Sequence, residues 1–204
     1  MKKIVTLTQY LDEIINWLAK REYLLKDYLQ HGLTELEIHH LLNKFPFQVS
    51  HEVIELYQWR NGVTAPSGTN SAFAPIYLSS YLEFMPLQSA LEISISGLDE
   101  LSGFYDIDFF CIFVSLGQDL VGIPTQSVFS STLPVVEINN DGYGANIIFS
   151  SIAKMMETLL VCFQEGAVFL QEGILHSDYE KYGRIALQIN PEIEYWHKYV
   201  KGEI

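Results

Sequence analysis

The chain has 204 residues, of which 49% are hydrophobic, 13% aromatic and 18% charged. This composition excludes an unfolded chain, which would be poor in aromatic residues and rich in charge, and it favours one globular domain with a substantial core. The formal net charge of −13 argues against binding to nucleic acid or to an anionic membrane, because phosphate groups repel such a chain. Basic proteins are the partners that this charge attracts.

Two helices are predicted near the start of the chain. Apolar residues recur near the 3.6-residue period over residues 8–30, which predicts an amphipathic helix. Thr34 and Glu37 have the spacing of a capping box, in which each side chain bonds a backbone N–H of the other residue. The second helix is therefore expected to begin after Thr34, to run to about Lys44 and to stop before Pro46.

The stretch LYQWRNGV closes a third predicted helix, which begins after Ser50. Asn61 and Gly62 are typical of the left-handed backbone that follows a helix end. Tyr57 lies on the apolar face of this helix and is expected in the core. Trp59 lies off that face, so we expect a half-exposed ring that is a candidate anchor for a partner, because tryptophan is enriched in binding hot spots.

Short strands follow the loop after Gly62, and helices return near the C-terminus. Apolar runs predict strands within residues 106–117, 119–124 and 134–138, after a strand and a short helix within 76–93. Ser150 or Ser151 is positioned to cap a helix that Gly166 ends, and the tail contains a further short helix before Pro191. These segregated runs predict an α+β fold: a central, mainly antiparallel sheet flanked by N-terminal and C-terminal helices that cover one side.

Three segments resemble the SUKH superfamily, the group named for fungal cell-wall assembly regulators of the Smi/Knr type. The first is FPFQVSHEVIELYQWRNG, in which Pro46 precedes a helix and Tyr57, Asn61 and Gly62 belong to its aromatic and Asn-Gly end. The second is FFCIFVSLGQDLVGI, similar to a strand pair around Gly-x-Asp, and the third is SSIAKMMETLLVCFQEGAVF, similar to a Ser-capped helix of bacterial members. The chain departs from the pattern at Ile152, where leucine is expected, and in a longer loop after Gly62.

The resemblance implies one SUKH-like domain over residues 1–204, with the family-like core at about 33–169, an extra N-terminal helix at 8–30 and a C-terminal extension at 170–204. It implies a protein-binding module, not an enzyme, and no cofactor. Bacterial members resemble immunity proteins that neutralise toxins, and fungal members resemble regulators of cell-wall synthesis. An immunity-type protein with a basic toxin as its partner is therefore the expected function, and a regulatory scaffold that binds an envelope enzyme is the alternative.

Acidic residues are concentrated in the middle of the chain. Lys, Arg and His are absent between Arg60 and Lys154, where nine acidic residues lie. A solvated sheet edge accounts for this pattern, and an acidic face that steers a basic partner is the functional interpretation. We expect the charged rim of that face to consist of Asp99, Glu100, Asp106 and Asp108.

Asp106 and Asp108 also form an Asp-x-Asp pair whose side chains would share one face of a strand. Such a pair can hold a divalent metal or act as acid and base, so a metal-dependent enzyme is a third hypothesis. A solvated lip at the start of the apolar run FFCIFV is the favoured interpretation, because no phosphate-binding loop or basic group lies nearby in the sequence. Neither a catalytic site nor a metal site is therefore expected.

Location is inferred from the apolar segments and the cysteines. The start MKKIVTLTQYLDE has no apolar run of signal-peptide length, and no segment approaches the ~20 apolar residues that span a bilayer. Cys111 and Cys162 lie in apolar runs, which is typical of buried thiols and unlike a secreted disulfide framework. The cytoplasm is the expected location.

Overall fold

The computed structural model describes residues 5–64, 76–101, 108–115, 119–125, 130–139 and 144–204, with residues 97–101 described by their backbone alone. In this part of the chain the α-helices are α1 (Leu7–Ala19), α2 (Glu35–Leu42), α3 (His51–Trp59), α4 (Leu87–Leu101), α5 (Ile152–Glu165), α6 (Tyr179–Ile189) and α7 (Glu194–Lys201). The strands are β1 (Leu29–His31), β2 (Arg60–Val63), β3 (Leu82–Phe84), β4 (Phe109–Ser115), β5 (Leu120–Pro124), β6 (Val135–Ile138), β7 (Ala145–Phe149), β8 (Val168–Gln171) and β9 (Ile174–Ser177).

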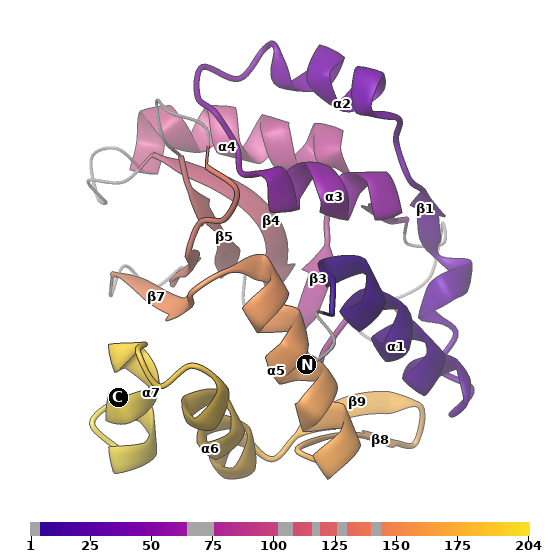
Figure 1. The fold of residues 1–204 in the computed structure, drawn as a ribbon, viewed down its shortest axis with the longest axis vertical. Helices are drawn as coiled ribbons and strands as arrows, with labels where there is room; N and C mark the ends of the chain where they lie inside the picture. The colour runs from indigo at the N-terminus through magenta and orange to yellow at the C-terminus, as the bar shows by residue number, and fades with distance from the viewer. Residues whose placement is uncertain (1–4, 65–75, 102–107, 116–118, 126–129, 140–143) are drawn as a thin grey trace.

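A five-stranded antiparallel sheet forms the centre of the fold, in the order β3-β4-β5-β6-β7 (Figure 1). Each strand pairs with the next strand of the sheet along the chain, and α4 connects β3 to β4. Two smaller antiparallel pairs, β1 with β2 and β8 with β9, lie outside this sheet. Helices precede and follow the sheet in the chain, so the predicted α+β class is confirmed.

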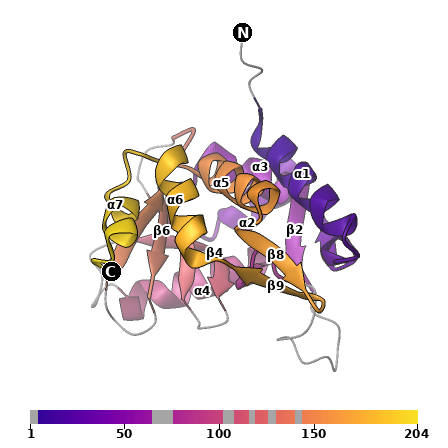
Figure 2. The same cartoon turned by 90° about the horizontal axis from the view of Figure 1, so that it is seen from below.

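Helices cover both faces of the central sheet. Figure 2 shows α4 on one side of the sheet and α1, α3, α5 and α6 on the other. On the α4 side, the backbone N–H of Cys111 on β4 donates to the Ser94 hydroxyl at 2.9 Å. The residues from Phe109 to Phe113 are all buried, as a strand covered on both faces requires. The expectation of helices on one side of the sheet is therefore wrong. The short helix predicted within residues 76–93 is α4, which has 15 residues and covers the second face of the sheet.

Aromatic rings join α3 to the sheet. The ring centroid of Tyr57 on α3 lies 5.3 Å from that of Phe84 on β3, and Phe84 lies 5.5 Å from Phe113 on β4. Tyr57 is fully buried, and its hydroxyl donates to the Met85 carbonyl at 3.2 Å, which satisfies the polar end of the side chain. Tyr57 therefore occupies the core position that its place on the helix predicts.

The first helix is shorter than its apolar period predicts. α1 ends at Ala19, and Glu22 has a left-handed φ of 62°, which turns the chain away from the helix axis. A short 3-10 helix, Leu25–Asp27, follows, and β1 then pairs with β2. The apolar period continues beyond Ala19 because residues such as Tyr23 are buried in the same core, although they are not helical.

The Asn61–Gly62 step lies in a strand and does not cap a helix. α3 ends at Trp59, and β2 begins at the next residue. Gly62 has the predicted positive φ, 71°. Glycine is also required here because two backbone segments approach closely: a Cβ atom at residue 62 would lie 2.2 Å from the backbone nitrogen of Pro86. The Asn61 side chain holds the same crossing, because it accepts from the backbone N–H of Leu87 at 2.9 Å.

The C-terminal tail folds back onto the rest of the domain. After α5 the chain forms the hairpin β8–β9, which turns at Glu172 and Gly173 with φ values of 52° and 81°, and then α6 and α7. The sequence predicts one short helix here and misses the hairpin, because Glu-Gly is a weak turn signal. The Trp196 indole on α7 donates to the Ile148 carbonyl on β7 at 2.5 Å, which ties the tail to the sheet.

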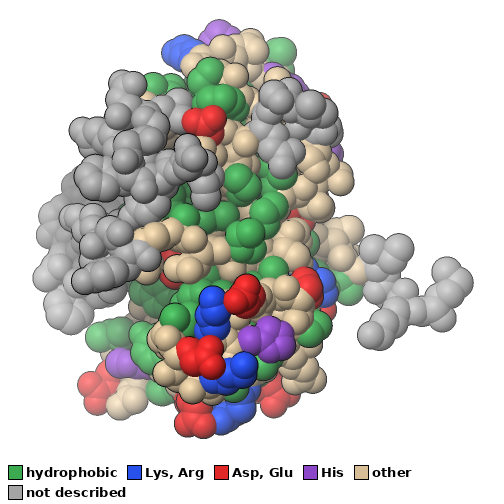
Figure 3. Space-filling model, turned by 90° about the vertical axis from the view of Figure 1, so that its left-hand side faces the viewer, with side chains coloured by type: hydrophobic (Ala, Val, Ile, Leu, Met, Phe, Trp, Pro, Cys, Tyr) green, Lys and Arg blue, Asp and Glu red, His purple; other side chains and the backbone are tan. Residues whose placement is uncertain are grey.

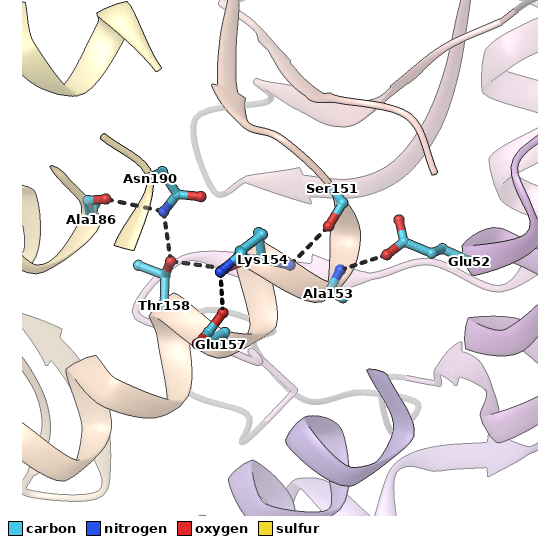
Figure 4. Close-up of polar contacts among 8 residues, drawn as sticks. All are labelled: Glu52, Ser151, Ala153, Lys154, Glu157, Thr158, Ala186 and Asn190. Atoms are coloured by element: carbon cyan, nitrogen blue, oxygen red, sulfur yellow. Dashed lines mark hydrogen bonds and ion pairs between the residues drawn. The ribbon is translucent and has the colours of Figure 1, made fainter. Parts of the chain in front are cut away.

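Polar contacts hold α5 between the early helices and the tail (Figure 4). At its N-terminus, the buried Glu52 carboxylate accepts from the backbone N–H groups of Ile152 and Ala153 at 3.0 and 3.1 Å. Burial raises the pKa of Glu52 more than these hydrogen bonds lower it. On the tail side, the buried Asn190 side chain donates to the Thr158 hydroxyl at 3.0 Å. α5 therefore sets the position of α6.

Candidate functional site

A pocket lies between the central sheet and the C-terminal helices. Its volume is about 380 Å³, within the range of ligand sites in proteins. Four lining residues lie on or next to β4, β5 and β6, one precedes β3, and six come from the tail. These lining residues are Ser115, Asp119, Glu137, Asn139, Tyr81, Ser177, Tyr179, Tyr182, Tyr195, Trp196 and Tyr199. We refer to this site as the tyrosine pocket.

The strand register makes the floor of the tyrosine pocket acidic. Glu137 on β6 pairs with Val121 on β5, which pairs with Phe113 on β4, so these side chains share one face of the sheet. Where β4 ends, the Ser115 hydroxyl donates to Asp119 Oδ2 at 2.9 Å, and the Asp119 backbone N–H donates to the Ser115 hydroxyl oxygen at 3.0 Å. The pocket thus receives one carboxylate from β6 and one from the residue before β5.

Trp196 is the centre of the aromatic wall. Its buried indole meets the Tyr195 ring edge-on at a centroid distance of 4.9 Å, and it lies 5.6 Å from Tyr199 and 5.8 Å from Tyr182. Tyr182 belongs to α6 and the other rings to α7, so the wall needs both helices. Tyr179 is 59% exposed and forms the outer edge of the wall.

Burial changes the acidity of the groups in the tyrosine pocket. The pKa of Glu137 rises from 4.5 to about 6, first because burial disfavours the carboxylate and second because Asp119 repels it. Burial is also the main reason that the pKa of Tyr195 rises to about 12 and that the pKa values of Tyr81 and Tyr182 rise further. At neutral pH Tyr81, Tyr182 and Tyr195 are therefore hydroxyl donors, and Glu137 is mostly ionised.

The described lining of the tyrosine pocket includes no Lys, Arg or His. Basic residues on the neighbouring helices pair with acids on the helix surface: Lys198 with Glu194 at 2.9 Å on α7, and Arg184 with Glu180 on α6. Figure 3 shows acidic and basic side chains intermixed at the lower end of one face, where the C-terminal helices lie. The pocket itself combines negative potential with aromatic walls.

Trp59 does not form an exposed lip. The residue is only 8% exposed, and its indole N–H donates to Asp12 Oδ1 on α1 at 2.8 Å. The Arg60 guanidinium lies 5.4 Å from the ring centroid and covers it further. The expectation of a half-exposed anchor is wrong, because α1 packs against the side of α3 that the helix pattern alone leaves open.

Of the predicted acidic rim, Asp108 is the member whose side chain is described. It is exposed and immediately precedes β4. Asp99 and Glu100 belong to the end of α4, where the backbone alone is described, and Asp106 lies outside the described residues. The rim therefore stays a prediction. The acidic residues that the structure does bring together, Asp119 and Glu137, come from the same cation-free segment.

The residues of the tyrosine pocket are far apart in the chain, so the sequence alone does not predict that they form one site. Tyr81 precedes the sheet, whereas most of the wall comes from the tail. A signal is present in the tail: Tyr179 and Tyr182 are three residues apart, and Tyr195 and Tyr199 are four apart. Such spacings place aromatic rings on one face of a helix. They indicate two aromatic faces but not what those faces cover.

Metal and membrane features are also absent from the described residues. No group of three or more His, Cys, Asp or Glu side chains in this part of the chain is arranged to hold a metal ion. None of the described helices is both long and apolar enough to cross a membrane. Cys111 and Cys162 are buried free thiols.

Two sequence comparisons of this chain were made, one with protein-family models and one with curated proteins. No protein-family model matches it, and no curated protein matches it in a sequence search. Membership of the SUKH superfamily therefore stays a prediction from the three sequence segments.

Proposed function

We propose that this protein is a non-catalytic, protein-binding module of the immunity type, which neutralises a basic toxin by covering its active surface. The observation that carries the proposal is the tyrosine pocket, where Asp119 and Glu137 lie among aromatic rings and the described lining has no basic residue. The SUKH resemblance supports the same role. A stable regulatory complex in envelope synthesis is the alternative, and the identity of the partner distinguishes the two.

Charge and aromatic side chains support binding in different ways. The net charge of −13, with no cation between Arg60 and Lys154, attracts a basic partner over distance and raises its association rate. Tyrosine supplies a large contact area and a hydroxyl at low entropic cost, which is why it is enriched in protein interfaces. The pocket supplies both at one place, so it is where we expect the partner to make its central contact.

The test begins with capture of the partner from the native lysate and its purification. Association rates are then measured against ionic strength for the wild type, for Asp119→Asn with Glu137→Gln, and for the control Glu13→Gln with Glu92→Gln. Both double variants remove two negative charges, but the control residues are exposed and outside the pocket. We expect the wild-type rate to fall roughly tenfold or more at high salt. The pocket variant should dissociate faster than the control.

The immunity role has its own readout. The captured partner should arrest growth when it is produced alone, and co-production of this protein should restore growth. A partner without toxicity, found with envelope-synthesis enzymes, would replace the immunity role by the regulatory one. An acidic partner, or association rates that do not change with salt, would overturn the electrostatic basis of the proposal.

A further inference from the structure

We propose that the tyrosine pocket binds a guanidinium group, the head of an arginine side chain that the partner inserts between Glu137 and the aromatic wall. The inference names the chemistry of the site and rests on the proposed function only for the source of the arginine. The pocket, its two carboxylates and its rings carry the inference independently of any family relation.

The two carboxylates of the pocket favour a cation over a neutral ligand. Glu137 is half-buried and close enough to Asp119 to be repelled by it. No hydrogen bond or ion pair joins the Glu137 carboxylate to another described residue. A half-buried carboxylate next to a second carboxylate is unfavourable in the free protein, and a bound cation relieves both the burial cost and the repulsion. A sugar or other neutral ligand can donate hydrogen bonds to the carboxylate, but it brings no positive charge to offset the repulsion between Glu137 and Asp119.

The aromatic wall favours a guanidinium over an ammonium group. Both cations are attracted to the face of a tyrosine or tryptophan ring. The guanidinium, however, is planar, stacks on such rings and is more weakly hydrated, so it enters a half-buried site at a smaller desolvation cost. With Tyr81, Tyr182, Tyr195 and Tyr199 around Trp196, the pocket offers ring surface on several sides.

The acceptors of the pocket also match a group with many donors. A guanidinium has five N–H donors in one plane. The carboxylates of Asp119 and Glu137, both lining residues, are the acceptors for these donors. Ser177 adds a hydroxyl that is already positioned, because its oxygen lies 2.8 Å from the Ser80 hydroxyl oxygen. The volume of about 380 Å³ suits one side chain with a few waters better than an extended peptide.

The test uses N-acetyl-L-arginine amide as the probe and the full-length protein. N-acetyl-L-citrulline amide is the matched control ligand, because it has nearly the same shape with a neutral head, and N-acetyl-L-lysine amide tests the ammonium. The readout is the indole N–H signal of Trp196 in nitrogen–proton NMR spectra. The indole of Trp59, which is bonded to Asp12, is the internal reference.

We expect the arginine probe to shift the Trp196 signal with a dissociation constant of about 1 mM, as is typical of a small fragment. The lysine probe should bind several-fold more weakly, and the citrulline probe at least about tenfold more weakly. Glu137→Gln and Asp119→Asn should each weaken binding of the arginine probe about tenfold, whereas Glu92→Gln, at an exposed site outside the pocket, should not.

Three results would overturn the inference: equal binding of arginine and citrulline probes, an unchanged Trp196 signal, or equal affinity in the wild type and in Glu137→Gln. Glu137→Gln removes an unfavourable charge, so we expect this variant to fold. A loss of probe binding in the variant can therefore be assigned to the lost carboxylate. If the basic partner binds and the probe does not, this inference fails and the proposed function stands. If the probe binds and no basic partner does, the guanidinium site stands and the proposed function fails.

Discussion

The ring of Tyr199 on α7 lies against the backbone of Gly183 on α6, so closely that a Cβ atom at residue 183 would be 2.6 Å from Tyr199 Cδ1. The ring also borders the tyrosine pocket and lies 5.6 Å from Trp196. The absence of a side chain at residue 183 therefore lets α6 and α7 approach each other, and it sets the position of the Tyr199 ring in the pocket wall.

Gly183→Ala should displace the Tyr199 ring. Alanine raises helix propensity by about 1 kcal/mol, but the overlap with the ring costs about 1–3 kcal/mol, so we expect a net loss of about 1 kcal/mol in unfolding free energy. Binding of the arginine probe should weaken several-fold because the wall moves. Urea denaturation and NMR titration measure the two effects. Gln188→Ala, an exposed site on α6, is the control that should leave both unchanged.

Glu137→Gln should stabilise the free protein at neutral pH. The folded-state pKa of Glu137, about 6, exceeds the ordinary value of 4.5, so the folded state favours the protonated side chain. The stability from this group is fully present below about pH 4.5 and is lost as the pH rises through about 6. The variant avoids this loss and should gain at most about 2 kcal/mol above pH 7 and almost nothing near pH 4. Urea denaturation at several pH values checks this, and a gain that is constant with pH would contradict it.

Binding of the arginine probe should weaken as the pH falls through about 6. A cation binds the ionised Glu137, so protonation competes with it, and the affinity should fall about tenfold between pH 7 and pH 5. The ionisable groups that line the pocket with Glu137 are Asp119, Tyr81, Tyr179, Tyr182, Tyr195 and Tyr199. Isothermal titration calorimetry measures the profile. Glu137→Gln should flatten it, and a profile that stays steep in this variant would assign the titration to another group.

Gly62→Ala should be among the most damaging single substitutions. The new Cβ would meet the Met85–Pro86 backbone at 2.2 to 2.6 Å, in addition to the strain of a positive φ. Gly202 has the same φ, 71°, with open space around it, so Gly202→Ala isolates the strain alone. We expect a loss of about 3–5 kcal/mol for Gly62→Ala and about 1 kcal/mol for Gly202→Ala. Similar thermal midpoints for the two variants would contradict this prediction, because they would show that β2 and residues 85–86 can move apart at little cost in free energy.

Local signals in the sequence were sufficient for much of the fold. The Thr34 and Glu37 side chains form the predicted capping box, and Ser151 and Gly166 bound α5 as expected. The apolar runs at β4, β5 and β6 are strands. Each of these features depends on residues within one or two turns or on a period that the chain shows directly, so no knowledge of distant contacts is needed.

The sequence by itself determined the α+β class, the positions of most elements and a negatively charged, cation-free middle segment. Only the tertiary structure decided that Trp59 is buried under α1, that the tail returns to the sheet, and that Glu137 faces the rings of α6 and α7. The physical reason is that strand register and helix docking bring together side chains with no sequence relation. A shift of one residue in β6 would turn Glu137 to the opposite face of the sheet.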